Sequence, residues 1–160
     1  MPEHVKTVPM SALTPLMEEI LCGGGSVELT VTGRSMEPML HDRVSRVRLA
    51  APRKLRRGDL PLYRRADGSY VLHRVTQADG RCMTCCGDAQ WVFEPNITRS
   101  QIVAVMEAFD REGGRWVRAD SALYGAYWRV WLALRPLRHL VIGGARRIKR
   151  LLRGAEGAGA

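Results

Sequence analysis

Two side chains in this sequence have the chemistry needed to hydrolyse an amide or ester bond, and the first is a serine at a predicted corner. Ser35 lies in the stretch Gly33–Pro38, directly after the alternating apolar run 27–31. Gly33 can adopt the backbone angles of a tight turn, and Pro38 cannot donate to a sheet ladder. A serine presented on such a corner acts as a nucleophile if a base reaches its hydroxyl, whereas the common alternative is a polar loop serine.

The base would be His73, because it falls in an apolar strand pattern where a half-buried imidazole keeps a fixed direction. A histidine is mostly neutral at pH 7 and can accept a proton. The commoner role of a lone strand histidine is a core residue bonded to a carbonyl. The other three histidines lie in the N-terminal end, a charged loop and the basic C-terminal segment: His4, His41 and His139.

The four cysteines raise the alternative of zinc or redox chemistry. Cys82, Cys85 and Cys86 lie close together, but one Cys-x-x-Cys lacks the second ligand pair of a structural zinc site. Cys22 and a histidine would have to complete it, and a strand would point Cys82 and Cys85 to opposite faces. We therefore expect ordinary thiols in a reducing, cytoplasmic setting, with no metal and no cofactor.

The elements that must position these residues are predicted to be mainly strands. A short helix is expected to be capped by Thr14 and to end at Gly23 in a left-handed conformation. Pro61 indicates an edge strand, and one slip in the alternation of 44–49 indicates a bulge. The predicted strands are 27–31, 44–49, 60–63, 70–75, 81–86, 102–109 and 116–117. The fold class is therefore mainly β, with one helix before the strands and a helical segment after them.

The chain changes character near residue 120. Residues 1–120 form the predicted domain, and 121–160 a basic, aromatic, amphipathic helical tail with a frayed Gly/Ala end, broken or kinked at Pro136. The net charge of +9 is partly concentrated there. Residues 121–153 would either contact an anionic membrane peripherally, at its inner face, or pack on the body or a second subunit. We expect no transmembrane helix and no secretory signal.

Four motifs in order resemble the signal peptidase I (S26) family, which is related to the self-cleaving S24 repressor peptidases. They are Gly33-Arg34-Ser35-Met36-Glu37-Pro38, Arg57-Gly58-Asp59-Leu60, His73-Arg74-Val75 and Gly87-Asp88. The resemblance spans roughly residues 27 to 107. It implies an all-β catalytic core that binds extended peptide by strand addition.

The resemblance also implies a Ser–His mechanism, since His73 stands where most bacterial members have lysine. Either Glu94 or Asp88 would support the imidazole. The Ser35 N–H would be one oxyanion donor. Gly33 stands where many relatives have a serine that supplies a second donor. After the serine motif, the pair His41-Asp42 stands where the family has Gly-Asp. Substrate-binding positions carried over from the motifs are Gly33, Met36, Pro38 and Leu72.

The expected function is a serine endopeptidase that removes leader or signal segments from peptide or protein precursors after small residues. The alternative is a catalytically inactive peptide-binding or regulatory module with the same fold. No helix-turn-helix pattern precedes the domain, so specific nucleic-acid binding is not expected despite the basic tail.

Overall fold

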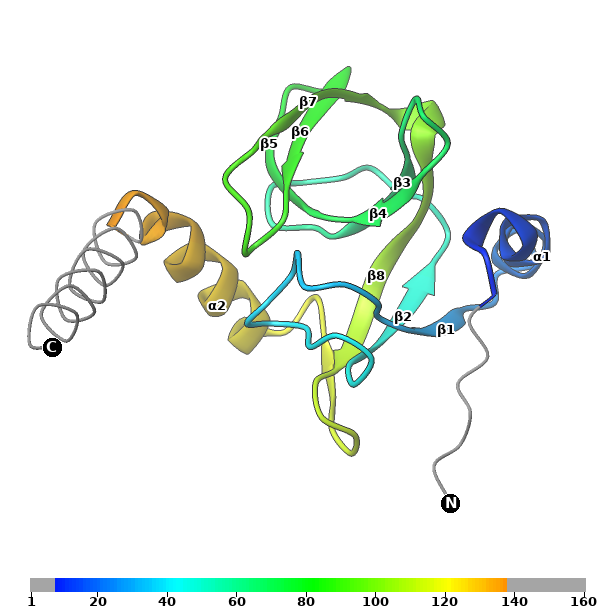
Figure 1. Cartoon of the computed structure of the whole chain (residues 1–160), viewed down its shortest axis with the longest axis horizontal. Helices are drawn as coiled ribbons and strands as arrows, with labels where there is room; N and C mark the ends of the chain where they lie inside the picture. Colours follow the sequence, from blue (N-terminus) through cyan, green and yellow to red (C-terminus); the bar gives the residue numbers. More distant parts are fainter. Residues whose placement is uncertain (1–7, 138–160) are drawn as a thin grey trace, which may run out of the picture. The chain divides into compact units, whose positions relative to one another are not determined.

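The computed structural model describes residues 8–137, and these divide after Gly125 into two compact units. The first unit is mainly β, as the sequence predicts (Figure 1). The predictions made for residues 138–160 lie outside the described part of the chain.

Two antiparallel sheets build the first unit. The larger has the order β1 (Val27–Thr30), β2 (Arg46–Ala50), β8 (Ile102–Asp110), β3 (Pro61–Arg64), β4 (Tyr70–Leu72), with β9 (Trp116–Arg118) also pairing with β8. The smaller has the order β5 (Arg74–Ala78), β6 (Cys82–Cys86), β7 (Glu94–Thr98), and Figure 1 shows it curling opposite β3 and β4. A 3₁₀ turn, Arg99–Gln101, leads from β7 into β8.

The central strand is β8, which pairs with β2, β3 and β9. Its sequence is a near-continuous apolar run, and eight of its nine residues are buried, the pattern of a strand covered on both faces. Side chains of both sheets meet in one core. This core comprises Tyr63, Val75, Met83, Cys85, Ile97, Ile102 and Val105.

The N-terminal helix begins earlier than the sequence suggested. Helix α1 spans Met10–Cys22, and Thr14 lies inside it, where its hydroxyl donates to the Met10 carbonyl at 2.7 Å. A hydroxyl satisfied in this way does not cap, so the prediction for Thr14 was wrong. Gly23 has φ −73°, and the left-handed residue is Gly24 at φ +78°, so that prediction was also off by one residue.

Pro61 does not mark an edge strand, because β3 has a neighbour on each side. Proline is the first residue of β3, and the pairing with β4 begins only at Leu62. A missing N–H at that position therefore breaks no bond to β4. The bulge predicted within 44–49 was wrong: β2 begins only at Arg46, after the slip, and the register shift between Arg48 and Leu49 leaves the extra residue, Glu107, in β8.

The run 70–75, predicted as one strand, is two strands in different sheets. Strand β4 ends at Leu72, β5 begins at Arg74, and His73 between them is in neither. The chain leaves the larger sheet and enters the smaller one at this histidine. Apolar periodicity alone did not reveal the change, because both halves of the run face the shared core.

Strand β7 was not predicted at all. Its sequence contains Pro95 and Asn96, which strands disfavour, and Asn96 adopts φ +61°. The pairing of β6 with β7 is correspondingly irregular, with a register shift between Met83 and Cys85. Tertiary contacts override local propensity in this strand.

The second helix, α2, spans Ala122–Ala133 and therefore ends before Pro136, in keeping with the predicted break. Its sequence is aromatic, and Tyr127 and Trp131 stack with ring centroids 6.0 Å apart. Among the described residues, no helix is both long and apolar enough to cross a membrane.

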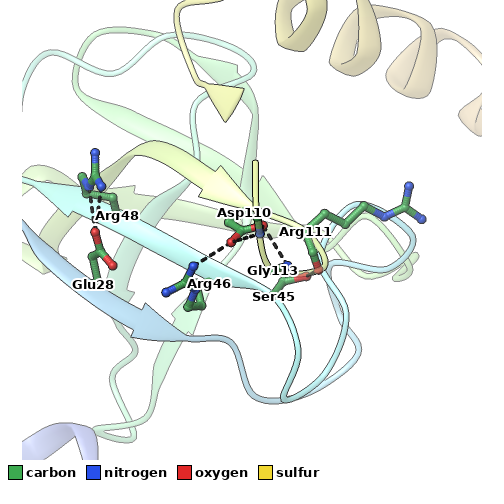
Figure 2. Close-up of polar contacts among 8 residues, drawn as sticks. Glu28, Ser45, Arg46, Arg48, Asp110, Arg111 and Gly113 are labelled. Atoms are coloured by element: carbon green, nitrogen blue, oxygen red, sulfur yellow. Dashed lines mark hydrogen bonds and ion pairs between the residues drawn. The ribbon is translucent and has the colours of Figure 1, made fainter. Parts of the chain in front are cut away.

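Asp110 secures the end of the larger sheet (Figure 2). Its carboxylate accepts a hydrogen bond from Arg46 at 2.7 Å and further bonds from the N–H groups of Gly113 and Gly114 in the β8–β9 turn. The Arg46 hydrogen bond is the largest of several that lower the pKa of Asp110 to about 2. Nearby, Ser45 donates to the Arg111 carbonyl at 2.7 Å. Together these bonds tie the chain that follows the serine corner to the far end of β8.

Candidate active site

His73 is almost completely buried at the junction between the sheets, with 1 % of its surface exposed. Its Nδ1 lies 3.0 Å from Oε1 of Glu94 and 3.3 Å from the Tyr63 hydroxyl. A carboxylate can only accept, so the neutral imidazole carries its proton on Nδ1. This tautomer leaves the lone pair of Nε2 available to accept a proton from another group.

Glu94 is the first residue of β7 and is itself held in place by Arg65. The Arg65 guanidinium donates through Nε to Oε2 of Glu94 at 2.7 Å and through a second nitrogen to Oε1. The Arg65 hydrogen bond is the main reason that the pKa of Glu94 is lowered. Glu94 therefore stays ionised and fixes the direction of the His73 ring.

The electrostatics keep His73 neutral. Burial lowers the pKa of His73, and the Glu94 charge only partly opposes this effect, while the nearby Arg65 charge adds to the lowering. The Tyr63 hydroxyl, whose pKa burial raises, remains protonated. A neutral, oriented imidazole is the protonation state that a general base requires.

Ser35 lies in the long turn between β1 and β2, and it is half-buried. The two ends of this turn are close, because the N–H of Arg43 donates to the Val31 carbonyl at 2.8 Å. The Gly33 N–H donates to Oδ1 of Asp42 at 2.8 Å, and Gly33 has φ +92°. The serine corner is thus closed by Asp42, the aspartate of the pair His41-Asp42.

The serine turn packs directly against the end of β6. The Ser35 carbonyl accepts from the Ala89 N–H at 2.9 Å. A Cβ at Gly87 would lie 2.6 Å from that carbonyl oxygen and 3.1 Å from Ser35 Cβ, so only glycine fits there.

The same glycine lies at the end of the β5–β6 ladder that His73 precedes. The β5–β6 ladder ends at the pair Arg74–Cys86, so His73 directly precedes and Gly87 directly follows this last pair. Ser35 packs on Gly87, so the serine turn lies at the same end of the β5–β6 ladder as His73, although thirty-eight positions separate the two residues in the sequence.

Asp88 has a different partner from Glu94. It forms a two-pronged ion pair with Arg74, with the Arg74 Nε 2.8 Å from Oδ1 and a terminal nitrogen 2.6 Å from Oδ2, and both side chains are buried. Of the two acids proposed to support the imidazole, Glu94 is the one at 3.0 Å from it. Asp88 instead joins the strand that follows His73 to the turn that holds the Ser35 carbonyl.

The predicted substrate-binding residues differ in how far they are exposed to solvent. Gly33 and Pro38 are exposed on the serine turn, and Leu72 is half-buried at the end of β4. Met36 is only 1 % exposed and packs in the core, which contradicts a direct contact with substrate. Within residues 8–137 the Ser35 N–H has no hydrogen-bond partner, so it is available as an oxyanion donor, whereas the Gly33 N–H is taken by Asp42.

Two contributors to the site were missed at the level of sequence. Tyr63 and Arg65 lie on and just after β3, and they reach His73 and Glu94 only because β3 pairs with β4 next to the junction. Neither residue belongs to the four motifs. A charged residue two positions after a buried tyrosine carries no signal of its own.

The cysteines are apart from this chemistry. All four are free thiols, and burial raises the pKa of Cys85 to about 12, which makes it a poor nucleophile. Among the described residues no group of three His, Cys, Asp or Glu side chains is arranged to hold a metal ion.

Comparison of the chain with protein-family models, with curated proteins and with solved structures found no match. Any function assigned to it therefore follows from the sequence motifs and from the contacts described above.

Proposed function

We propose that the protein is a serine endopeptidase in which Ser35 is the nucleophile, His73 the general base and Glu94 the acid that orients it. The observation that carries the proposal is the 3.0 Å contact between the buried His73 and the half-buried Glu94, which leaves Nε2 to accept a proton, while Ser35 packs on Gly87 at the same end of the β5–β6 ladder. Orientation of a neutral imidazole by a carboxylate is the arrangement that recurs in unrelated serine hydrolases.

In the proposed reaction Ser35 Oγ attacks the carbonyl carbon of a peptide bond while its proton passes to Nε2 of His73. The developing oxyanion faces the N–H of Ser35. The tetrahedral intermediate then expels the amine, which takes the proton from His73. A water molecule, deprotonated by the same imidazole, attacks the acyl-enzyme and releases the new carboxylate together with the serine.

The proposed substrate is a leader or signal segment of a peptide or protein precursor, bound in an extended conformation and cut after a small residue. In the described part of the chain β4 pairs only with β3, so its other edge is open to an added strand. This edge ends at Leu72, the residue before His73. The specificity for small residues rests on the resemblance to signal peptidases alone.

The test is covalent labelling of the full chain with a fluorophosphonate probe. We expect Ser35→Ala to abolish labelling and His73→Gln to slow it at least about a hundredfold, since general bases contribute roughly 10²–10⁴. Ser100→Ala, at an exposed serine outside the site, is the matched control and should label like the wild type. Equal labelling of all four proteins, or none of the wild type, would remove the proposed activity.

The alternative function is a catalytically inactive module that binds extended peptides. It is favoured by one observation, namely that Gly33 provides no side-chain donor and that its N–H already bonds to Asp42. In that case the wild type should stay unlabelled, yet bind leader-like peptides in fluorescence anisotropy.

We further propose that the protein acts in the cytoplasm, in peripheral contact with the inner face of an anionic membrane. The helical segment leaves several large apolar side chains exposed, which suits an interfacial helix. They are Leu123, Val130, Leu134 and Leu137. Flotation of the full chain with vesicles containing phosphatidylserine should be lost on Val130→Asp, and equal flotation of the variant would count against membrane contact.

A further inference from the structure

Arg74 is the most buried charged residue near the candidate site, and its hydrogen bonds join the third motif to the second, to the fourth and to the residue that follows the first. Besides the ion pair with Asp88, it donates to the Gly58 carbonyl at 3.1 Å and to the Met39 sulfur at 3.1 Å. Its side chain has no exposed surface. A buried guanidinium is tolerated only when its donors are satisfied, so each of these partners matters.

A partner of Arg74 from outside the motifs is Tyr124, in the first turn of α2. Arg74 donates to the Tyr124 oxygen at 2.9 Å, and the Tyr124 hydroxyl donates to the Gly58 carbonyl at 2.6 Å. The tyrosine is 3 % exposed, its ring packs on Phe109, and burial raises its pKa to about 12. The hydroxyl therefore stays protonated and serves as acceptor and donor at once.

Through these two partners Tyr124 is linked to the base. The N–H of Gly58 donates to the Val75 carbonyl at 2.9 Å, and the Val75 N–H donates to the Asp59 carbonyl at 2.9 Å. Gly58 and Arg74 together therefore fix the start of β5, the strand that His73 immediately precedes.

Tyr124 is linked to the nucleophile in a similar way. Arg74 holds Asp88, and the next residue, Ala89, donates to the carbonyl of Ser35. Arg74 also touches Met39 in the serine turn. A shift of the Arg74 guanidinium would thus move the serine turn and the histidine strand relative to each other.

We propose that Tyr124 is a positioning residue for the Ser35–His73 pair, acting through Arg74 and Gly58. This inference rests on the proposed peptidase function and extends the catalytic unit into α2. It extends the catalytic unit past residue 120, because the hydroxyl that completes the Arg74 environment belongs to Tyr124.

The experiment uses Tyr124→Phe in the full chain, which removes the hydroxyl and keeps the ring. Its control is Ser100→Ala, which removes a hydroxyl from an exposed residue outside the site. The readouts are the rate constant of fluorophosphonate labelling, kcat and KM on a leader-like peptide, and the thermal unfolding midpoint. We expect labelling and kcat to fall about tenfold or more in Tyr124→Phe, with KM unchanged, because misplaced reacting groups affect the chemical step rather than binding. Ser100→Ala should match the wild type.

The outcomes distinguish the positioning role of Tyr124 from the proposed peptidase function. If the wild type reacts and Tyr124→Phe reacts as fast as Ser100→Ala, the role of Tyr124 is overturned and the peptidase proposal stands. If Tyr124→Phe is slower only in proportion to its unfolded fraction, measured by circular dichroism at the assay temperature, the role is also overturned. If the wild type does not react at all, the peptidase proposal fails and the positioning role fails with it.

Discussion

At the residue scale, the two acids next to the site have distinct partners and should have distinct phenotypes. Glu94 contacts His73, and Glu94→Gln removes the charge and can turn an amide NH2 toward Nδ1, which favours the wrong tautomer. We expect kcat to fall roughly 10²–10⁴-fold on a leader-like peptide, with a folded protein by circular dichroism. A variant with wild-type kcat would show that Glu94 does not orient the base.

Asp88→Asn should act mainly on stability. It breaks a buried ion pair with Arg74 and leaves the guanidinium uncompensated, which typically costs about 3–5 kcal/mol. Urea unfolding should show a lower midpoint at an unchanged slope. A loss below 1 kcal/mol would mean that Arg74 finds another partner.

The pH dependence follows from the lowered pKa of His73. A base must be neutral to act, so the acidic limb of kcat/KM should lie below pH 6.5, the usual value for histidine. Removing the Glu94 charge should move this limb further down, because that charge favours the imidazolium. A limb above pH 6.5 in the wild type would contradict the burial of a neutral histidine.

The residues of the site could be predicted from sequence only in part. Ser35 and His73 were proposed because they belong to motifs with a fixed order, and Glu94 was proposed as one of two alternatives. Only contacts distinguish Glu94 from Asp88, since both are acids at suitable positions. Arg65 and Tyr124 could not be found, because each acts through a partner that is distant in sequence.

At the element scale, the approach of the serine turn to the end of β6 depends on Gly87. Gly87→Ala would place a methyl group against the Ser35 backbone, so the turn must move away. We expect fluorophosphonate labelling to fall about a hundredfold, as for a displacement of about 1 Å, with a much smaller effect on the unfolding midpoint. Rapid labelling of the alanine variant would show that the turn need not approach so closely.

The strands were predictable where their local pattern agreed with their environment. Strand β8 is apolar and β-branched, and it is the buried centre of the sheet. Strand β7 has a poor local sequence and is held by its pairing with β6, so no local rule finds it. The break at His73 was missed for the opposite reason, because an uninterrupted apolar pattern crosses from one sheet to the other.

At the scale of the whole first unit, Asp110 should set part of the acid stability. The pKa of Asp110 is about 2 in the folded protein, below its ordinary value of 3.8. Its contribution to the free energy of unfolding is therefore fully present above pH 3.8 and is lost as the pH falls toward 2. Asp110→Asn should unfold at a lower temperature than the wild type at pH 7. The unfolding midpoints of the two proteins should converge between pH 4 and pH 2. A difference that stays constant with pH would show that the variant loses stability through packing and not through the charge of Asp110.

The position of His73 between the sheets has a consequence for how the activity is acquired. A chain in which only one sheet has formed already contains the serine, the histidine and the glutamate, yet nothing holds them in register. Under the proposed mechanism such a chain is catalytically inactive, and turnover begins only when the second sheet packs on the first. The onset of labelling during refolding would then report the moment at which the two sheets come together.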